Sequence, residues 1–204
     1  MKFVKFALAA VAALFISQAA DAQLYLTGGF GLSHTSGENK AGSITKDNDP
    51  ENTCSFTPEI GYYFADGLAF GAEVSLDHYK RKNADNKDYW KATNTCSFNP
   101  FFRWDFISGK DFSLGLKARV LLGFGKTKDQ DNDLNKLNHF GFSIVPVAQY
   151  NFNSHWGMYA TMGNLYYLHE VSKAANNDDN KSISNRLNAN VDLSSLKLGI
   201  VYTF

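Results

Sequence analysis

Acidic and basic side chains recur at alternate positions of several apolar segments, where their types and spacing allow chemistry. Glu59 and Glu73 lie at equal distances before and after the short turn at 65–67, which predicts similar depth on neighbouring strands. Two facing carboxylates could perform general acid–base catalysis. Lys117 and Arg119 occupy a further segment of this kind. Cations beside the carboxylates would hold them ionised, which favours a structural ion pair over catalysis.

The full set of charged residues at these alternating positions contains both signs. Charges enclosed in a narrow space should pair, because isolated buried charges are costly. We therefore interpret the set as a salt-bridge plug, with a gated solute pathway as the alternative. The predicted network consists of Glu59, Glu73, Asp77, Arg103, Asp105, Lys117, Arg119 and Lys197.

Two further groups of candidate ligands do not complete a site. Asp129, Asp131 and Asp133 resemble the start of a calcium loop, but Leu134 replaces the required glycine. Cys54 and Cys96 are expected on the apolar face with one strand between them. Two strand spacings of ~4.8 Å exceed the reach of a disulfide. The sequence predicts no catalytic residue, no metal site and no cofactor.

Length and charge narrow the classes of protein that remain. The chain has 204 residues with 20 basic and 20 acidic side chains, so its formal net charge is zero. A neutral chain offers no electrostatic footprint for nucleic acid. The length fits one domain.

The first 22 residues have the pattern of a secretory signal peptide. Lys2 and Lys5 precede an apolar run at 6–16, and Ala20-Asp21-Ala22 places small residues at positions −3 and −1 of a cleavage point. The apolar run is too short to span a bilayer. We expect cleavage after Ala22 and a single domain over 23–204.

From Gln23 onward the apolar pattern has a period of two, which is typical of strands with one apolar face. Short turns rich in Gly, Asp and Asn alternate with longer polar segments. This alternation predicts an all-β, eight-stranded, antiparallel up-and-down barrel. The expected strands are 24–33, 53–64, 68–79, 93–106, 112–125, 139–152, 156–169 and 191–204.

An internal repeat supports this topology. The segments SFTPEIGYYF, SFNPFFRWDF, SIVPVAQYNF and SLKLGIVYTF each begin with Ser and end with Phe. Pro58, Pro100 and Pro146 recur six residues before the terminal Phe, which predicts a bulge or a bend. The strand at 156–169 loses its alternation after Met162, which also suggests a bulge.

Three features predict that the apolar face points outward, toward lipid. The polar face is rich in glycine, which suits a crowded barrel interior. Ten residues of tilted strand span about 25 Å, the height of an outer-membrane apolar band. Aromatic residues gather near the turns, as in an interfacial girdle. The expected girdle is Tyr62, Phe64, Trp104, Phe106, Tyr150, Phe152, Tyr202 and Phe204.

With these features, the mature chain resembles the eight-stranded outer-membrane barrels of Gram-negative bacteria, the group of the OmpA transmembrane domain, OmpX and OmpW. The most specific part is the alternating C-terminal segment 198–204, which ends in Phe. The resemblance implies an assembly signal at Leu198, Ile200, Tyr202 and Phe204, read by the outer-membrane assembly machinery. It also implies periplasmic turns and four extracellular loops. The Asn-rich loops look like those of Bacteroidetes barrels.

The function expected from this resemblance is non-enzymatic. The protein should be a monomer in the bacterial outer membrane, in contact with its lipid and lipopolysaccharide, with a structural or surface-interaction role carried by the loops. Two alternatives stay open. One is a lipid A-modifying enzyme at the rim, because His34-Thr35-Ser36 has the His-x-Ser spacing of one deacylase family. The other is a small-solute channel gated by the charge network.

Overall fold

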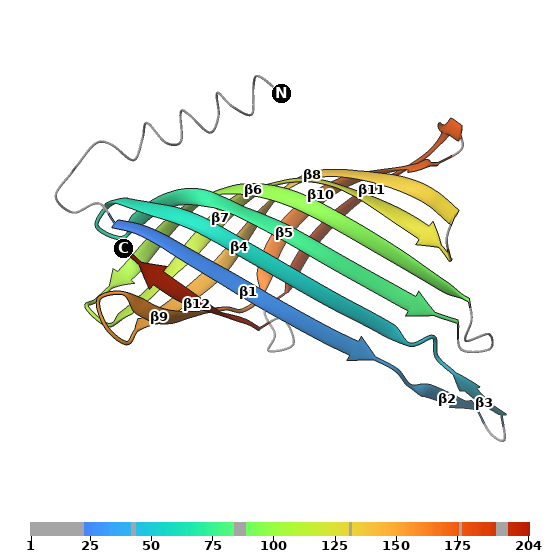
Figure 1. The fold of residues 1–204 in the computed structure, drawn as a ribbon, viewed down its shortest axis with the longest axis horizontal. Coiled ribbons are helices and arrows are strands. Elements are labelled where there is room, and N and C mark those ends of the chain that lie inside the picture. Colours follow the sequence, from blue (N-terminus) through green and yellow to red (C-terminus); the bar gives the residue numbers. More distant parts are fainter. Residues whose placement is uncertain (1–22, 42–43, 84–88, 131, 176, 191–195) are drawn as a thin grey trace.

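The computed structural model describes residues 23–41, 44–83, 89–130, 132–175, 177–190 and 196–204. The expected signal peptide at 1–22 lies outside the described residues. The regular structure within the described ranges is β-strand (Figure 1). These ranges contain no helix that is long and apolar enough to cross a membrane.

Twelve strands follow one another along the chain. They are β1 (Gln23–Thr35), β2 (Glu38–Ala41), β3 (Ile44–Asp47), β4 (Glu51–Ala65), β5 (Leu68–Lys82), β6 (Trp90–Ser108), β7 (Phe112–Asp129), β8 (Asn132–Asn151), β9 (Trp156–Thr161), β10 (Asn164–Ala174), β11 (Asn177–Asn190) and β12 (Lys197–Thr203). β2 and β3 form a separate hairpin between β1 and β4.

Eight of these strands form a closed ring of antiparallel neighbours. Their order is β8, β7, β6, β5, β4, β1, β12 and β9, and β9 pairs again with β8. Sequential strands are therefore neighbours, and the last strand pairs with the first. The predicted up-and-down barrel is confirmed.

The seventh and eighth strands differ from their predicted form. The expected strand 156–169 is divided into β9 and β10, and the expected strand 191–204 is the shorter β12. β8 pairs with β9 through Val147↔Thr161 and with β10 through Ile144↔Leu165, so the register changes by one residue between them. Gly163 at this break has a φ of 75°. The predicted bulge after Met162 is confirmed.

The recurrent prolines act in two different ways. Proline has no N–H to donate to a ladder. Beside Pro58 the pairing of β4 with β5 lapses between Phe56↔Leu76 and Glu59↔Glu73, yet the register is unchanged. β6 and β7 show the same lapse beside Pro100. The expectation of a bulge at these two prolines was wrong, because the interrupted ladder resumes in step. Only beside Pro146 does the neighbouring strand break and shift.

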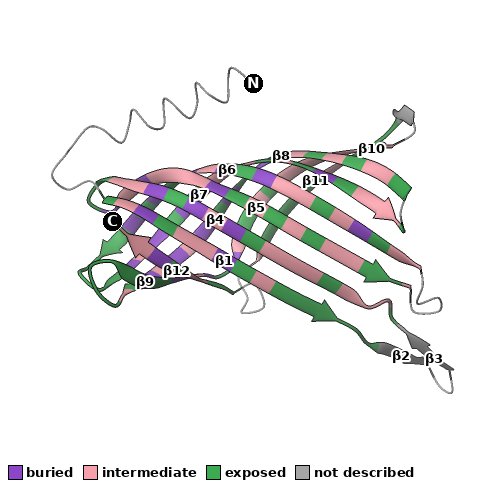
Figure 2. Cartoon of the chain, in the orientation of Figure 1, coloured by how far each residue is buried: buried purple, intermediate pink, exposed green. Residues whose placement is uncertain are grey.

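The outer wall of the ring is apolar and the inner wall is buried. Phe30, Leu32 and Phe124 are 61%, 73% and 64% exposed, while Tyr25 and Val201 are 1% exposed. Figure 2 shows the buried residues gathered toward the end of the ring where β9 and β12 lie. Large apolar side chains that alternate with buried polar ones fit a barrel whose surroundings are hydrocarbon. The predicted orientation is confirmed.

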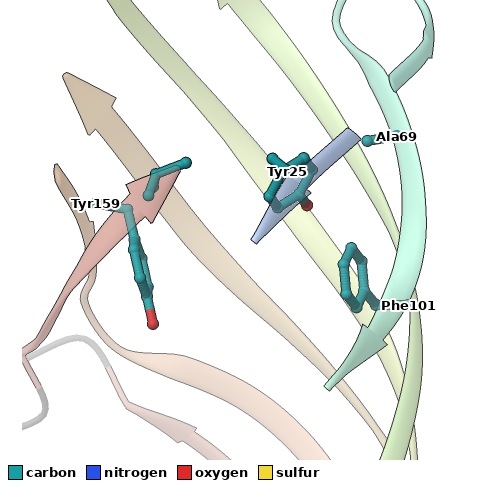
Figure 3. Close-up of a cluster of buried hydrophobic side chains, with 5 residues drawn as sticks. Tyr25, Ala69, Phe101 and Tyr159 are labelled. Carbon is teal, nitrogen blue, oxygen red and sulfur yellow. The ribbon is translucent and has the colours of Figure 1, made fainter. Parts of the chain in front are cut away.

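Aromatic rings fill the inner space where glycines leave room. The buried cluster consists of Tyr25, Ala69, Phe101, Tyr159 and Val201 (Figure 3). A Cβ added to Gly61 would lie 2.2 Å from the Tyr25 ring, and one added to Gly199 would lie 2.1 Å from the Tyr159 ring. Inward glycines therefore match the largest inward side chains on the next strand.

The two ends of the ring are built differently. Short turns join β4 to β5, β6 to β7 and β8 to β9, and we call this the short-turn end. At the long-loop end, strands continue into segments predicted as loops, including β2, β3 and β11. Among the described residues, β1 beyond Gly29 pairs only with β4, and β11 pairs only with β10. The ring is therefore complete at the short-turn end. Toward the long-loop end, one edge of β1 and one edge of β11 have no neighbouring strand among the described residues.

Candidate functional site

The centre of the inner wall carries a buried ionic cluster, which we call the Lys117 cluster: Glu59, Glu73, Lys117 and Arg119. Glu59 on β4 and Glu73 on β5 are directly opposite each other. Lys117 and Arg119 come from β7, which is separated from β5 by β6 in the ring. Glu59 and Glu73 are each 6% exposed and Lys117 is 4% exposed. Two cations thus stand beside two carboxylates in a space shielded from water.

The pairing within this cluster is direct. The Lys117 Nζ lies 2.5 Å from the Glu59 Oε2 and 3.4 Å from the Glu73 Oε2. The Arg119 Nη1 lies 3.1 Å from the Glu73 Oε1. Since the formal charges balance, the cluster avoids the cost of an unpaired buried charge.

Polar neighbours satisfy the atoms that the ion pairs leave over. The Tyr25 hydroxyl donates to the Glu59 Oε1 at 3.2 Å, and the Asn99 Nδ2 donates to the Glu73 Oε1 at 3.0 Å. The Arg119 Nε donates to the Ser143 Oγ at 2.9 Å. A carboxylate held by a cation and a neutral donor is fixed in position and poorly suited to moving a proton.

A second ionic cluster lies nearer the short-turn end, and we call it the Arg103 cluster: Arg103, Asp105, Tyr63, Gln149 and Ser113. Arg103 donates to the Asp105 Oδ1 at 2.8 Å, to the Gln149 Oε1 at 2.9 Å and to the Ser113 Oγ at 3.1 Å. The Tyr63 hydroxyl donates to the Asp105 Oδ2 at 2.8 Å. The guanidinium also lies over the Tyr63 ring, 5.6 Å from its centroid.

Two cavities of the bore meet these clusters from opposite sides. A vestibule of about 1040 Å³ at the short-turn end is lined by Tyr63, Asp105 and Gln149 of the Arg103 cluster. A smaller cavity of about 120 Å³ is lined by Glu73, Lys117 and Arg119 of the Lys117 cluster. The two clusters therefore lie between the two spaces, as a plug would.

Six of the eight residues predicted for the network belong to these clusters. The other two lie outside them. Asp77 is half-buried and accepts a hydrogen bond from Ser75 at 2.8 Å. Lys197 lines the smaller cavity with Glu73, but it is exposed and makes none of the ion pairs recorded among the described residues.

The uncharged partners of the clusters were not among the predicted residues. They are Tyr25, Tyr63, Asn99, Ser113, Ser143 and Gln149. Each has the inward parity of its strand, so alternation alone would have placed it in the bore. Their side chains are neutral, so charge alone does not identify them.

The histidine and aspartate candidates at the long-loop end have other partners. The His34 Nδ1 lies 2.8 Å from the Oδ1 of Asn52, the residue directly opposite on β4. Asp129 accepts a hydrogen bond from the Tyr89 hydroxyl at 2.6 Å, which raises the pKa of Tyr89. Asp131 lies outside the described residues. Where the structure is described, no three His, Cys, Asp or Glu side chains are grouped to hold a metal ion.

The outer-face candidates lie where alternation placed them. Cys54 and Cys96 are free thiols on β4 and β6, with β5 between them. The girdle residues near the short turns include Trp104 and Phe106, whose ring centroids are 5.9 Å apart. In the C-terminal strand, Leu198 and Ile200 are exposed on the outer wall, and Tyr202 packs edge-on against Phe204 at 5.0 Å. β12 lies between β1 and β9 and completes the ring.

Comparison with known proteins gives one family and several solved barrels. The family described as "Outer membrane protein beta-barrel domain" matches residues 6–204. The neisserial surface protein A is 14% identical with a TM-score of 0.38, covering 90% of this chain and 96% of its own. The attachment invasion locus protein Ail of Yersinia pestis is 12% identical with a TM-score of 0.37, covering 90% and 97%. Curated protein sequences give no match.

Proposed function

This chain belongs to the outer membrane protein beta-barrel domain family and lies in the bacterial outer membrane, and from that premise we propose a non-enzymatic structural or surface-interaction role. In this role the barrel wall anchors the protein in lipid, and the four long loops contact the exterior of the cell. The observation that carries it is the plug, because two fully paired ionic clusters occupy the bore between its two cavities.

The chemistry of the plug argues against catalysis in the bore. Glu59, Glu73 and Asp105 each have a cationic partner and a second hydrogen-bond donor. A general acid or base needs freedom to exchange a proton with a substrate. The cavity beside the Lys117 cluster, at about 120 Å³, is also smaller than the 300–1,000 Å³ that ligand pockets usually occupy.

The extended strands at the long-loop end support an exterior role. β6 and β8 contain 19 and 20 residues, about twice the length needed to cross the apolar band. Strand residues beyond the band form a rigid support for the loops, and exposed loops on a rigid scaffold are common sites of recognition. We further propose that the C-terminal strand is the part read by the assembly machinery and that the protein acts as a monomer.

The hairpin of β2 and β3 offers a clean test of the exterior role. The Asn48 N–H donates to the Gly37 carbonyl at 2.8 Å, so deletion of 38–47 joins two backbone positions already in contact. A host strain lacking the gene would be complemented with the full chain or with this deletion variant. Folding of each would be checked by heat-modifiable gel mobility. Cell attachment and resistance to a large antibiotic would be measured in parallel.

The outcomes separate the branches of the proposal. If the loops carry a surface interaction, the deletion variant folds but restores antibiotic resistance without attachment. If the role is structural alone, both proteins restore resistance and attachment does not depend on the hairpin. Lipid A from each strain would be analysed by mass spectrometry. An acyl pattern that changes with the presence of the protein would overturn the non-enzymatic role.

A further inference from the structure

A groove on the outer wall lies at the upper limit of the apolar band, outside the bore. It has a volume of about 540 Å³ and spans β4 to β7. Its floor consists of Cys54, Phe56, Leu76, Cys96 and Phe124. The two cysteines are short beside the phenylalanines, and Leu76 is directly opposite Cys96. The floor is therefore an apolar recess between projecting rings.

A polar row borders this groove toward the long-loop end. His78, Asn94, Lys126 and Lys136 are directly opposite one another in turn across β5, β6, β7 and β8. The first three also line the groove. The His78 Nδ1 lies 2.7 Å from the Asn94 Oδ1, so Nε2 is the ring nitrogen directed to other partners. We call His78, Asn94, Lys126 and Lys136 the basic row.

The charge around the basic row is mainly positive. Lys80 and Lys128 stand one outward position farther from the apolar band, and the Lys80 Nζ lies 4.5 Å from the centroid of the Trp90 ring. Asp133 lies 4.0 Å from the Lys126 Nζ and 3.6 Å from the Lys128 Nζ. Asp77 also lines the groove, but it has the inward parity of β5 and accepts a hydrogen bond from Ser75. One carboxylate shared between two lysines leaves a net positive surface at this height.

The same arrangement without lysine occurs elsewhere on the barrel. His34 and Asn52 form an equivalent cross-strand pair at 2.8 Å on β1 and β4. Neither β1 nor β4 contains a lysine or an arginine. A third His–Asn pair, His169 and Asn185 at 2.8 Å, lies on β10 and β11. Of these three pairs only His78 and Asn94 line the apolar groove.

We propose that the groove and the basic row bind an outer-leaflet lipid that carries a phosphate headgroup, with an acyl chain in the recess. Phosphate groups lie at the boundary of the hydrocarbon, where Lys126 and Lys136 place ammonium groups as point charges for phosphate. His78 and Asn94 add hydrogen-bond donors at the same level. The recess adds apolar contact that a free anion would not use. This site goes beyond the loop-mediated role and is independent of the plug.

Lipid retention by the intact folded protein tests the site. Purified protein in detergent would be mixed with dimyristoyl phosphatidic acid or with dimyristoyl phosphatidylcholine, and bound lipid would be counted by native mass spectrometry. Inorganic phosphate would be added as a competitor. We expect phosphatidic acid to be retained at about tenfold lower concentration than phosphatidylcholine, since each lysine adds attraction for an anionic headgroup. Millimolar phosphate should not displace it.

Matched variants separate the headgroup contacts from the recess. Lys126→Gln with Lys136→Gln should remove the preference for phosphatidic acid, while Lys110→Gln at the short-turn end should not. His78→Gln should weaken retention more than His34→Gln. Cys96→Phe fills the recess and should lower retention of both lipids. Gel mobility would confirm that each variant is folded.

Three results would overturn the proposal. They are equal retention of the two lipids by the unaltered protein, unchanged retention in the Lys126→Gln/Lys136→Gln variant, and displacement of phosphatidic acid by inorganic phosphate at equal concentration. The last result would indicate a simple anion site. None of these results bears on the attachment and lipid A experiments, so failure of this site is distinguishable from failure of the proposed function.

Discussion

Lys117 is the residue on which the inner network depends most. It is the only cation in contact with Glu59 among the described ion pairs, and it also contacts Glu73 directly opposite. Its removal would leave two carboxylates facing each other with Arg119 as their remaining partner. Loss of one member of a buried ion pair is more damaging than replacement of the whole pair, because it leaves an uncompensated charge.

We therefore predict that Lys117→Met lowers the free energy of unfolding by about 3–5 kcal/mol. Urea denaturation of the protein folded in lipid vesicles, followed by tryptophan fluorescence, measures this change. Glu59→Gln combined with Lys117→Met should recover part of the loss, because the charge and its partner are removed together. Equal midpoints for Lys117→Met and the unaltered protein would show that water inside the bore already screens the carboxylates.

Glycine on the inner wall has a packing role that glycine on the outer wall does not share. In Gly61→Ala the new Cβ would fall 2.2 Å from the Tyr25 ring, whereas in Gly28→Ala the nearest atom is the Pro58 Cα at 4.0 Å. Overpacking typically costs about 1–3 kcal/mol. We predict a loss of that order for Gly61→Ala and little change for Gly28→Ala, measured by the same denaturation. Similar losses at both sites would contradict the packing argument.

At the scale of the strand, alternation predicted most of what the structure shows. Period two located the strands, their inward and outward faces and the parity loss after Met162, because a buried face and a lipid face make different demands on every second residue. The strand extensions at the long-loop end were missed. At that end neither face has to be apolar, so β11 is rich in polar residues and its sequence does not identify it as a strand. Only its pairing with β10 in the structure does.

The consequences of the prolines could not be read from their own strands. Pro58 and Pro100 leave the register intact, while the strand beside Pro146 breaks at Gly163. The difference lies in the neighbouring strand, since Gly163, with a φ of 75°, separates β9 from β10, whereas β5 and β7 continue unbroken. Alternation likewise predicted that Asp77 and Lys197 face the bore. It could not predict that they lie outside the two ionic clusters, because the order of strands around the ring decides which inward charges meet.

These ladder gaps lead to a prediction for the strand pairs. Pro100→Ala restores an N–H that can donate to β7, and one net hydrogen bond contributes about 0.5–1.5 kcal/mol. We expect a gain of that order and slow hydrogen exchange at the new amide, observed by NMR in lipid nanodiscs. In Pro146→Ala the facing strand is broken, so the new amide should exchange faster. Rapid exchange at both positions would indicate that the gap has another cause.

At the scale of the whole molecule, the two ionic clusters together fill the bore between its two cavities. The ring of eight strands encloses a bore that inward rings and ion pairs fill, and the lipid-facing wall carries the remaining apolar surface. A barrel of this size gains stability from the contacts that block it, because its narrow interior is filled by side chains. Closure of the bore is thus a consequence of how the barrel is stabilised, and it can be tested by removing volume rather than charge.

We predict that the unaltered protein shows no unitary conductance steps in planar bilayers. Arg103→Ala combined with Lys117→Ala removes the central side chain from each cluster and should join the vestibule to the smaller cavity, which produces measurable steps. Glu59→Gln combined with Lys117→Met removes one ion pair of the Lys117 cluster at nearly constant volume and leaves Glu73 paired with Arg119, so this discharged variant should stay closed. Gel mobility before insertion confirms that each sample is folded, so silence cannot be attributed to unfolded protein. If the discharged variant conducts as well as the truncated one, charge pairing rather than side-chain volume closes the bore, and steps from the unaltered protein would mean that the clusters do not form a plug.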